Sequence, residues 1–339
     1  MLGCRSAVVA GLALASLVFS MPASAADALR VRVDWTPWSN QSPIHLANQK
    51  GLYEKHGLTV TVDDGNGSVT TVQIVGNGEY DVGLAAQGPM LIARSKGLPV
   101  KSIASFLRRN DIGLMVPADS GIKSPADLKG KKLAFTAGSI EAPFIDRFLA
   151  AGKLTRADVE LLGVDASAKA GTYMAGRADA AFSAIPFLMP VVAAQRPSTS
   201  VNFADFGLQF PSFGLFATEK TIADKRDQIR RFVSVTAGTW GYILAGHDDD
   251  AVQAMLAARP QAKLNPAVLK AQLVALKPFV DTEATKGKPA GTMVLSDWKT
   301  GVDTLAEAGL VERSLDPAAA FTNDMIDEKI VAEITGGKL

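Results

Sequence analysis

Apolar and polar residues alternate along several segments of the chain, and a period of two predicts β-strands. At residues 29–33 leucine and valine alternate with two arginines, and at 58–62 they alternate with threonines. Apolar runs predict further extended segments at 82–86, 99–107, 112–116, 133–136, 159–164 and 203–216. Helices are predicted between and after them, at 43–55, 69–75, 141–151, 223–245, 248–258, 266–274 and 296–308. Strands that alternate with helices in this way indicate an α/β fold.

Two short motifs add detail to this pattern. Ser124, Pro125 and Asp127 combine a capping hydroxyl, a proline in the first turn and an acid at the third position, so we expect a helix to begin there. Residues 78–81 (Gly-Glu-Tyr-Asp) and 176–179 (Gly-Arg-Ala-Asp) each stand between a helix and an apolar strand, which predicts two related lobes. A simpler explanation stays open, because glycine often ends a helix before a short turn.

The order of the predicted elements indicates two lobes with a discontinuous first lobe. Residues 26–110 would form the first part of lobe 1, residues 111–205 lobe 2, and residues 206–339 a largely helical return to lobe 1. The chain would then cross between the lobes twice, near 110–114 and 203–213. Strand ends and helix N-termini of both lobes converge between them in such a topology, so we expect a central ligand cleft.

The N-terminal segment predicts export. Residues 1–25 contain Arg5, an apolar stretch at 7–19 and the small-residue end at 23–25 (Ala-Ser-Ala), which together are typical of a secretory signal peptide. The stretch is shorter than the roughly 18 residues expected of a membrane-spanning helix. We therefore predict cleavage near Ala25 and a periplasmic mature protein. Cys4 is the only cysteine and leaves with the signal, which excludes disulfides, thiolate catalysis and cysteine-bound zinc in the mature chain.

Charge and motif content narrow the function. Of the 35 lysines and arginines only Arg5 lies in the signal, which leaves 34 basic against 34 acidic residues and argues against a nucleic-acid partner. The chain shows no nucleophile elbow, paired histidine ligands or dinucleotide fingerprint in a suitable context. Three dispersed histidines predict no metal site. We expect no cofactor and no enzyme activity, although a secreted enzyme with an unrecognised site stays an alternative.

Several motifs resemble a known family over nearly the whole mature chain. They are Asp34-Trp35-Thr36-Pro37, Gly121-Ile122-Lys123-Ser124-Pro125 with the residues up to 132, and the segments 51–58, 76–83, 309–311 and 321–323. The chain resembles the periplasmic solute-binding proteins of ABC importers, which include taurine, aliphatic sulfonate, nitrate and thiamine-pyrimidine binders. This resemblance implies a type II periplasmic-binding-protein fold, a small-molecule ligand and delivery to a permease and its ATPase. It also implies a monomer without cofactor.

Within that family the chain looks most like the binders of pyrimidine-type thiamine precursors. The Asp-Trp-Thr-Pro and Gly-Ile-Lys-Ser-Pro stretches carry this resemblance. That branch typically continues Asp-Trp-Thr-Pro with asparagine, whereas this chain has Trp38 inside the expected pocket loop. The yeast thiamine-pyrimidine synthase shares the fold, but its chemistry needs a cysteine-rich iron motif that the mature chain lacks.

The loop after the first strand is the first candidate ligand contact. Trp35 and Trp38 could stack on an aromatic ring, and Asp34 could accept a hydrogen bond. The alternative is that a tryptophan beside a proline packs as a loop anchor. Asn66 and Ser68 precede a helix, whose free N–H groups could hold an anion or a carbonyl. A plain glycine turn with Ser68 as the helix cap explains that loop equally well.

Other post-strand positions complete the predicted rim. Glu141 could accept from an amino group or a protonated ring nitrogen, or serve only as a favourable charge at a helix N-terminus. His45 is a weaker candidate, because a lone histidine is more often structural. Small residues are expected from Gln87, Gly88 and Ser139, and the segments 183–186, which begins with Ser183, and 209–213 would complete the rim, with Phe210 or Phe213 as aromatic walls.

We therefore predict that the ligand is a small heteroaromatic molecule, such as a thiamine-related pyrimidine. The named loops contain no lysine or arginine, which disfavours an aliphatic sulfonate, nitrate or another small organic anion. Helix N-termini alone can hold an anion, so that alternative stays open. A ligand sensor that docks onto a receptor instead of an importer is a third reading.

Overall fold

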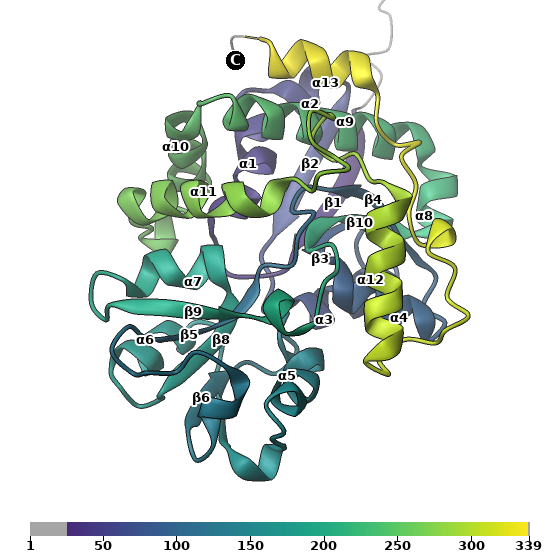
Figure 1. Cartoon of the computed structure of the whole chain (residues 1–339). Coiled ribbons are helices and arrows are strands. Elements are labelled where there is room, and N and C mark those ends of the chain that lie inside the picture. Colours follow the sequence, from purple (N-terminus) through teal and green to yellow (C-terminus); the bar gives the residue numbers. More distant parts are fainter. Residues whose placement is uncertain (1–25, 338–339) are drawn as a thin grey trace, which may run out of the picture.

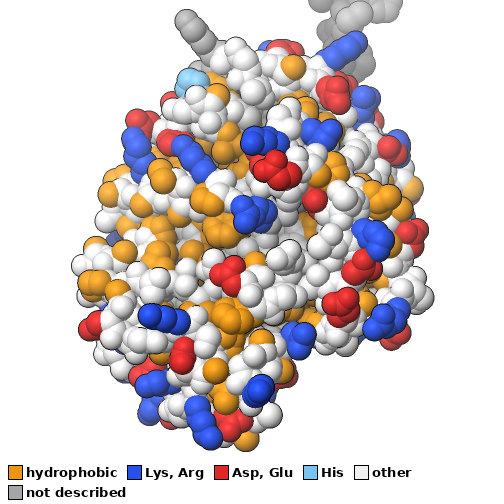
Figure 2. Space-filling view, viewed as in Figure 1, with side chains coloured by type: hydrophobic (Ala, Val, Ile, Leu, Met, Phe, Trp, Pro, Cys, Tyr) orange, Lys and Arg blue, Asp and Glu red, His pale blue; other side chains and the backbone are white. Residues whose placement is uncertain are grey.

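Two five-stranded sheets, each covered by helices, make up the computed structural model, which describes residues 26–337. Figure 1 shows the lobe built on the first sheet (lobe 1) above the lobe built on the second (lobe 2). The predicted signal peptide and its cleavage near Ala25 lie outside the described residues. Within the described residues, no helix is both long and apolar enough to cross a bilayer. Basic and acidic side chains are interspersed over the face seen in Figure 2.

The sheet of lobe 1 has the strand order β2-β1-β3-β10-β4. Strand β1 is parallel to β2 and β3, and β10 is antiparallel to both β3 and β4. The strands are β1 (Asp27–Val33), β2 (Leu58–Asp63), β3 (Val82–Ala86), β4 (Val100–Ser105) and β10 (Phe213–Thr218). The strand that returns from lobe 2 is thus inserted between two strands formed earlier in the chain.

The sheet of lobe 2 repeats this arrangement in the order β7-β6-β8-β5-β9. Strand β6 is parallel to β7 and β8, and β5 is antiparallel to β8 and β9. The strands are β5 (Ile112–Pro117), β6 (Lys132–Phe135), β7 (Glu160–Gly163), β8 (Ala180–Ala184) and β9 (Ser198–Asn202). In each sheet the fourth strand is therefore the one that arrives from the other lobe.

The two glycine-to-aspartate motifs occupy equivalent places in these sheets. The Arg30 N–H donates to the Asp81 carboxylate (2.9 Å), and the Asp81 N–H donates to the Arg30 carbonyl (3.0 Å). Lys132 and Asp179 exchange the same two bonds, at 2.8 Å each. Each aspartate precedes the third strand in the order of its sheet and fixes it to the second, β1 or β6. The motif thus marks an internal repeat rather than a chance helix end.

Helices cover both sheets (Figure 1). Lobe 2 carries α5 (Ile145–Ala151), α6 (Lys169–Met174) and α7 (Ile185–Val192). The other helices are α1 (Ser42–Gln49), α2 (Leu52–Lys55), α3 (Ser68–Gly76), α4 (Gln87–Ser95), α8 (Glu219–Asp224), α9 (Arg226–Leu244), α10 (Asp248–Ala258), α11 (Pro266–Val280), α12 (Leu295–Glu307) and α13 (Glu328–Thr335). Single 3-10 turns occur at Ser39–Gln41, Pro125–Leu128, Ala142–Phe144, Arg156–Asp158, Phe203–Phe206, Pro260–Ala262 and Ala318–Ala320.

Several predicted elements differ in the structure for local reasons. The helix expected at 43–55 is broken into α1 and α2, because Gly51 takes the left-handed conformation at φ 63°. The capping box at Ser124 forms, but it starts only a 3-10 turn, which Lys129 ends with an extended ψ of 123°. The segment 203–216 is not extended throughout: it contains a 3-10 turn before β10 begins. Helices α4, α7, α8 and α13 and strand β9 were not anticipated.

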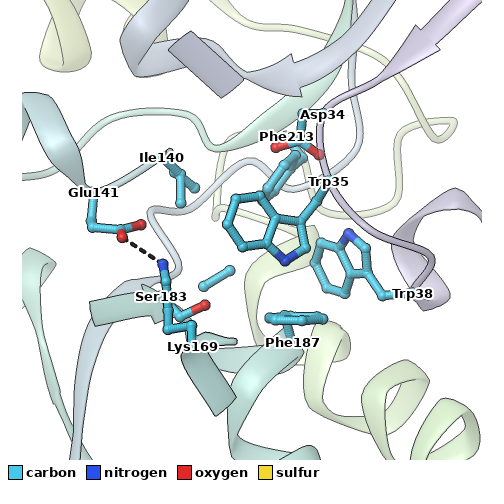
Figure 3. A pocket seen from close by; sticks show the side chains of 10 residues that line it. Asp34, Trp35, Trp38, Ile140, Glu141, Lys169, Ser183, Phe187 and Phe213 are labelled. Carbon is cyan, nitrogen blue, oxygen red and sulfur yellow. Dashed lines mark hydrogen bonds and ion pairs between the residues drawn. The ribbon is translucent and has the colours of Figure 1, made fainter. Parts of the chain in front are cut away.

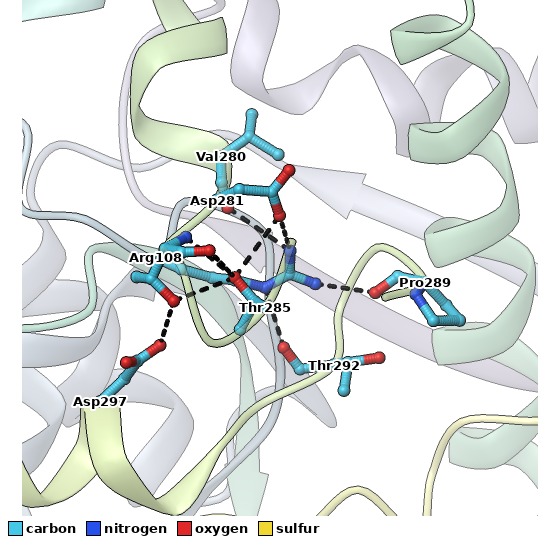
Figure 4. A network of polar contacts seen from close by, with 8 residues as sticks. Arg108, Val280, Asp281, Thr285, Pro289, Thr292 and Asp297 are labelled. Carbon is cyan, nitrogen blue, oxygen red and sulfur yellow. Dashed lines mark hydrogen bonds and ion pairs between the residues drawn. The ribbon is translucent and has the colours of Figure 1, made fainter. Parts of the chain in front are cut away.

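The first crossover, between β4 and β5, is anchored to lobe 1 by Arg108 (Figure 4). This guanidinium is only 4% exposed and pairs with Asp281 at 2.6 Å. It also donates to the carbonyls of Pro289 (2.7 Å) and Thr292 (2.8 Å). Because the Arg109 N–H also donates to the Phe279 carbonyl of lobe 1 at 3.1 Å, any bending of this crossover begins after Arg109.

Candidate functional site

A narrow, nearly filled cavity of about 10 Å³ lies between the two lobes, at the carboxyl ends of strands from both sheets (Figure 3). Lobe 1 contributes the loop after β1 and the first residue of β10. Lobe 2 contributes the loop after β6, the start of α6, the end of β8 and the start of α7. The lining residues are Asp34, Trp35, Trp38, Ile140, Glu141, Lys169, Ser183, Ala184, Phe187 and Phe213.

Aromatic rings form the walls of this cavity. The Phe187 ring from lobe 2 meets Trp35 and Trp38 from lobe 1 edge to face, with centroids 6.1 Å and 5.6 Å apart. Phe213 lies on the other side of Trp38, at 5.5 Å. Both indole N–H groups are buried and have no hydrogen-bond partner among residues 26–337. The aromatic walls of the two lobes therefore touch, and the indole N–H groups of Trp35 and Trp38 remain available as hydrogen-bond donors.

Glu141 and Lys169 form a buried ion pair within lobe 2. Lys169 Nζ lies 2.6 Å from Glu141 Oε1 and donates to the Phe182 carbonyl at 3.0 Å. The same Glu141 oxygen accepts from the Thr136 N–H at 3.2 Å. Its second oxygen, Oε2, is buried without a partner in the described part of the chain. Burial lowers the pKa of Lys169, and the Glu141 carboxylate acts against that shift.

Lys169 also faces the aromatic wall of lobe 1. Its Nζ lies 5.0 Å from the centroid of the Trp35 ring, within the range of a cation–π contact. The named loops contain no lysine or arginine, but α6 brings a lysine to the cavity from outside them. That cation is already paired with Glu141, so the pair as a whole adds no net charge to the cavity.

Asp34 is buried beside the tryptophans. Its Oδ2 accepts from the Ser68 hydroxyl at 2.5 Å, and Oδ1 has no partner among the described residues. Burial raises the pKa of Asp34 to about 7; the Ser68 hydrogen bond opposes the shift and the negative charge of Asp111 adds to it. Burial likewise raises the pKa of Asp111, which accepts from the Ser212 hydroxyl, to about 7.

The N-terminus of α3 holds a carbonyl of the other lobe. The N–H groups of Val69 and Thr70 donate to the Gly138 carbonyl of lobe 2, at 2.9 Å and 3.4 Å. A β-carbon on Gly67 would lie 2.1 Å from that carbonyl oxygen, so the two backbones meet where only glycine fits. The Ser68 hydroxyl binds Asp34 and does not cap the helix. The predicted anion site is thus filled by the chain itself in this conformation.

The structure brings half of the predicted site residues together. Asp34, Trp35, Trp38, Glu141, Ser183 and Phe213 all line the cavity. Asn66 is exposed, and Ser68 touches the site only through Asp34. Ser139 donates to the Thr136 carbonyl at 2.7 Å. The side chains of Asn66, Ser68, Gln87, Gly88, Ser139 and Phe210 are not part of the lining.

Gly88, Gln87 and His45 lie in other surroundings. Gly88 makes room for Phe144 of lobe 2 and Phe210 of the second crossover, whose rings lie 4.8 Å apart. The backbone N–H of Gln87 donates to the Ser212 carbonyl at 2.7 Å, whereas both amide atoms of its fully buried side chain have no partner among residues 26–337. His45 lies on α1 outside this cavity, and burial lowers its pKa to about 4.

Ile140, Lys169 and Phe187 line the cavity without having been predicted. Ala184 belongs to the segment 183–186 that was expected to form the rim, and Phe187 lies one residue beyond it. Lys169 follows the loop after β7, a position that the same post-strand rule would have reached. Lys169 stands between two alanines and outside any recognisable motif, so no other feature of the sequence indicated that it lines the cavity.

Comparisons with known proteins agree with this architecture. The family model described as NMT1/THI5 like matches residues 38–250. The formylaminopyrimidine-binding protein of Halalkalibacterium halodurans is 23% identical over 308 residues, 88% of this chain and 91% of that protein. The 4-amino-5-hydroxymethyl-2-methylpyrimidine phosphate synthase THI5 of Saccharomyces cerevisiae is 32% identical over 110 residues, 32% of each chain.

A solved structure shows the same fold. The alkanesulfonate-binding protein SsuA of Xanthomonas axonopodis pv. citri, bound to MOPS, superimposes with a TM-score of 0.64 at 20% identity. The match covers 87% of this chain and 98% of that one. The architecture is the two-lobed fold of periplasmic binding proteins, as the sequence indicated. Because the family model spans more than half of the sequence, this chain belongs to the NMT1/THI5-like family.

Proposed function

We propose that this chain is the extracytoplasmic solute-binding component of an ABC importer and captures an aminopyrimidine related to thiamine. The observation that carries the proposal is the cavity between the lobes, where tryptophan faces stand beside carboxylates with unused oxygens. The formylaminopyrimidine-binding relative, which aligns over most of both chains, supports the ligand class.

The polar groups of the cavity complement an aminopyrimidine. Glu141 Oε2 is an acceptor without a donor among residues 26–337, and Asp34 Oδ1 is one above the Asp34 pKa of about 7; both then suit the hydrogens of an exocyclic amino group. The indole N–H groups of Trp35 and Trp38 are donors without an acceptor there, and they suit ring nitrogens. A buried polar group without a partner costs about 1–3 kcal/mol, so a ligand that satisfies all four gains both affinity and specificity.

Closure of the lobes is the working motion in this proposal. Phe187 touches both tryptophans, so the walls must separate to admit a flat ring between them. Two crossovers allow such a hinge, and a ligand that contacts both lobes favours the closed state by its differential affinity. The closed surface would then dock on the permease. Residues 26–110 and 206–339 would move against residues 111–205, in an exported monomer.

The experiment is a thermal-shift screen of ligand-free protein. The panel contains 4-amino-5-hydroxymethyl-2-methylpyrimidine, its formylamino analogue, flavin fragments, aromatic acids, taurine, alkanesulfonates and nitrate. A ligand at about 100 times its dissociation constant adds about 2.7 kcal/mol of stability, which is readily measured. Stabilisation by the pyrimidines alone supports the proposal. Stabilisation by sulfonates or nitrate without any aromatic compound contradicts it.

A small organic anion is the second candidate, and Lys169 is the observation in its favour. This lysine puts a cation in the cavity, and the fold is shared with an alkanesulfonate-binding protein. Two contacts weigh against the anion: Glu141 pairs with Lys169, and the Gly138 carbonyl fills the N-terminus of α3. We propose no enzyme activity for the chain, since the relative that aligns over nearly its full length is named as a binding protein and the yeast synthase aligns over only a third.

A further inference from the structure

Gln272 joins the two walls of the ligand cavity, although it does not line it. It lies on α11, which packs along α7 of lobe 2 (Figure 1), and its side chain is only 2% exposed. One end of its amide reaches the loop that carries Trp38. The other end reaches the turn of α7 that carries Phe187.

The orientation of this amide is fixed by its partners. Gln272 Oε1 accepts from the Ser39 N–H at 3.1 Å, and Nε2 donates to the Phe187 carbonyl at 3.0 Å. The Ser39 N–H is only a donor and the Phe187 carbonyl only an acceptor, so the amide cannot be turned over. The Ser39 hydroxyl lies 3.2 Å from the same oxygen, but it donates at 2.7 Å to the Leu269 carbonyl.

Both partners are directly coupled to aromatic walls. Ser39 follows Trp38, which is 1% exposed, and the Phe187 ring lies edge to face with Trp38 at 5.6 Å. We propose that Gln272 is a positioning residue that sets the gap between Trp38 and Phe187 and holds the lobes together at this edge of the cavity. This inference rests on the proposed function, because it assigns the gap to the ligand that enters there.

Position 272 requires a side chain that both accepts and donates a hydrogen bond. In Gln272→Glu the carboxylate still accepts from the Ser39 N–H but cannot donate to the Phe187 carbonyl, so only the hydrogen bond to lobe 2 is lost. Leucine has a similar size and loses both links. Gln261→Glu is the matched control, since Gln261 is exposed and the change adds the same charge without touching the cavity.

Two measurements test the inference. Stopped-flow tryptophan fluorescence gives the dissociation rate of 4-amino-5-hydroxymethyl-2-methylpyrimidine, and small-angle scattering gives the radius of gyration without ligand. Gln272→Glu should raise the dissociation rate about 2- to 10-fold, the worth of one hydrogen bond, and should increase the ligand-free radius. Gln272→Leu should do at least as much. The control should match the wild type in both measurements.

The outcomes separate this inference from the proposed function. If the wild type binds none of the pyrimidines, the proposed function fails, and the scattering result still decides whether Gln272 holds the lobes. An unchanged ligand-free radius in both Gln272 variants overturns the inference. A residue that only stabilised α11 would lower the unfolding midpoint without changing the radius or the dissociation rate, and that pattern also overturns it.

Discussion

Lys169 Nζ lies 2.6 Å from Glu141 Oε1, and neither side chain is more than 1% exposed. The pair joins the start of α6 to the loop after β6, and it forms one face of the cavity. Removing one partner of such a pair leaves the other charge buried and uncompensated, which is more costly than losing the attraction itself.

We therefore expect Lys169→Met to cost about 3–5 kcal/mol of unfolding free energy, measured by urea denaturation. The double variant Lys169→Met with Glu141→Gln should recover most of the loss, because it removes both charges. Lys132→Met is the control: it breaks the exposed pair with Glu160 and should cost less than about 1 kcal/mol. Equal costs for Lys169→Met and Lys132→Met would contradict this view.

The raised pKa of Asp34 predicts a pH-dependent stability. Between pH 4 and about 7 the unfolded chain ionises Asp34 while the folded chain retains the proton, because burial raises the folded pKa from 3.8 to about 7. The unfolding free energy contributed by this group therefore falls as pH rises, by up to about 1.4 kcal/mol per pH unit, and is level above pH 7.

Urea unfolding of the wild type and Asp34→Asn at several pH values isolates this effect, since Asp111 and His45 titrate in both proteins. The wild type should lose stability relative to the variant up to about pH 7. Ser68→Ala should move the levelling point to higher pH, because the Ser68 hydrogen bond lowers the pKa of Asp34. A constant difference between wild type and Asp34→Asn across this range speaks against a buried, protonated Asp34.

Gly67→Ala should hinder closure without harming either lobe. Its β-carbon would collide at 2.1 Å with the Gly138 carbonyl, an atom of the other lobe that moves away when the cleft opens. We expect weaker ligand binding and less compaction on ligand addition in small-angle scattering. Gly171→Ala is the control, because a β-carbon there has no neighbour within 4 Å. Wild-type compaction of Gly67→Ala would show that the lobes close without this contact.

Trp35→Ala and Glu141→Gln should each weaken aminopyrimidine binding. The first removes a ring face worth about 0.5–1.5 kcal/mol beyond its buried area, and the second replaces an oxygen acceptor with a group that can also donate. Isothermal titration of each variant measures the effect. Full affinity in both variants would mean that the ligand lies elsewhere, even if the ligand class is right.

The fold could be predicted from sequence because its signals are local and repeated. Period-two alternation marked β1 and β2, and the motifs ending at Asp81 and Asp179 marked the same junction in both lobes. Helix ends were less predictable. The capping box at Ser124 has the same hydrogen bonds as one that begins a long helix. The helix ends after one turn only because the backbone becomes extended at Lys129, after Leu128.

The site was predictable only where it follows the strand ends. Trp35 and Glu141 lie directly after β1 and near the end of β6, so the topology places them without further information. Which small loops face the cavity and which meet the opposite lobe depends on the closed geometry. Gln272 acts through contacts with distant segments, and no local sequence pattern around it indicates this role.

The position of β10 also determines the order in which the molecule can assemble. The sheet of lobe 2 is complete once residues 112–202 are present, whereas β4, which ends at Ser105, joins its sheet through β10, which begins at Phe213. Closing so long a loop is entropically costly and slow, so we expect lobe 1 to finish folding after lobe 2. The cavity takes walls from both lobes, and we therefore expect it to be the last part of the protein to form.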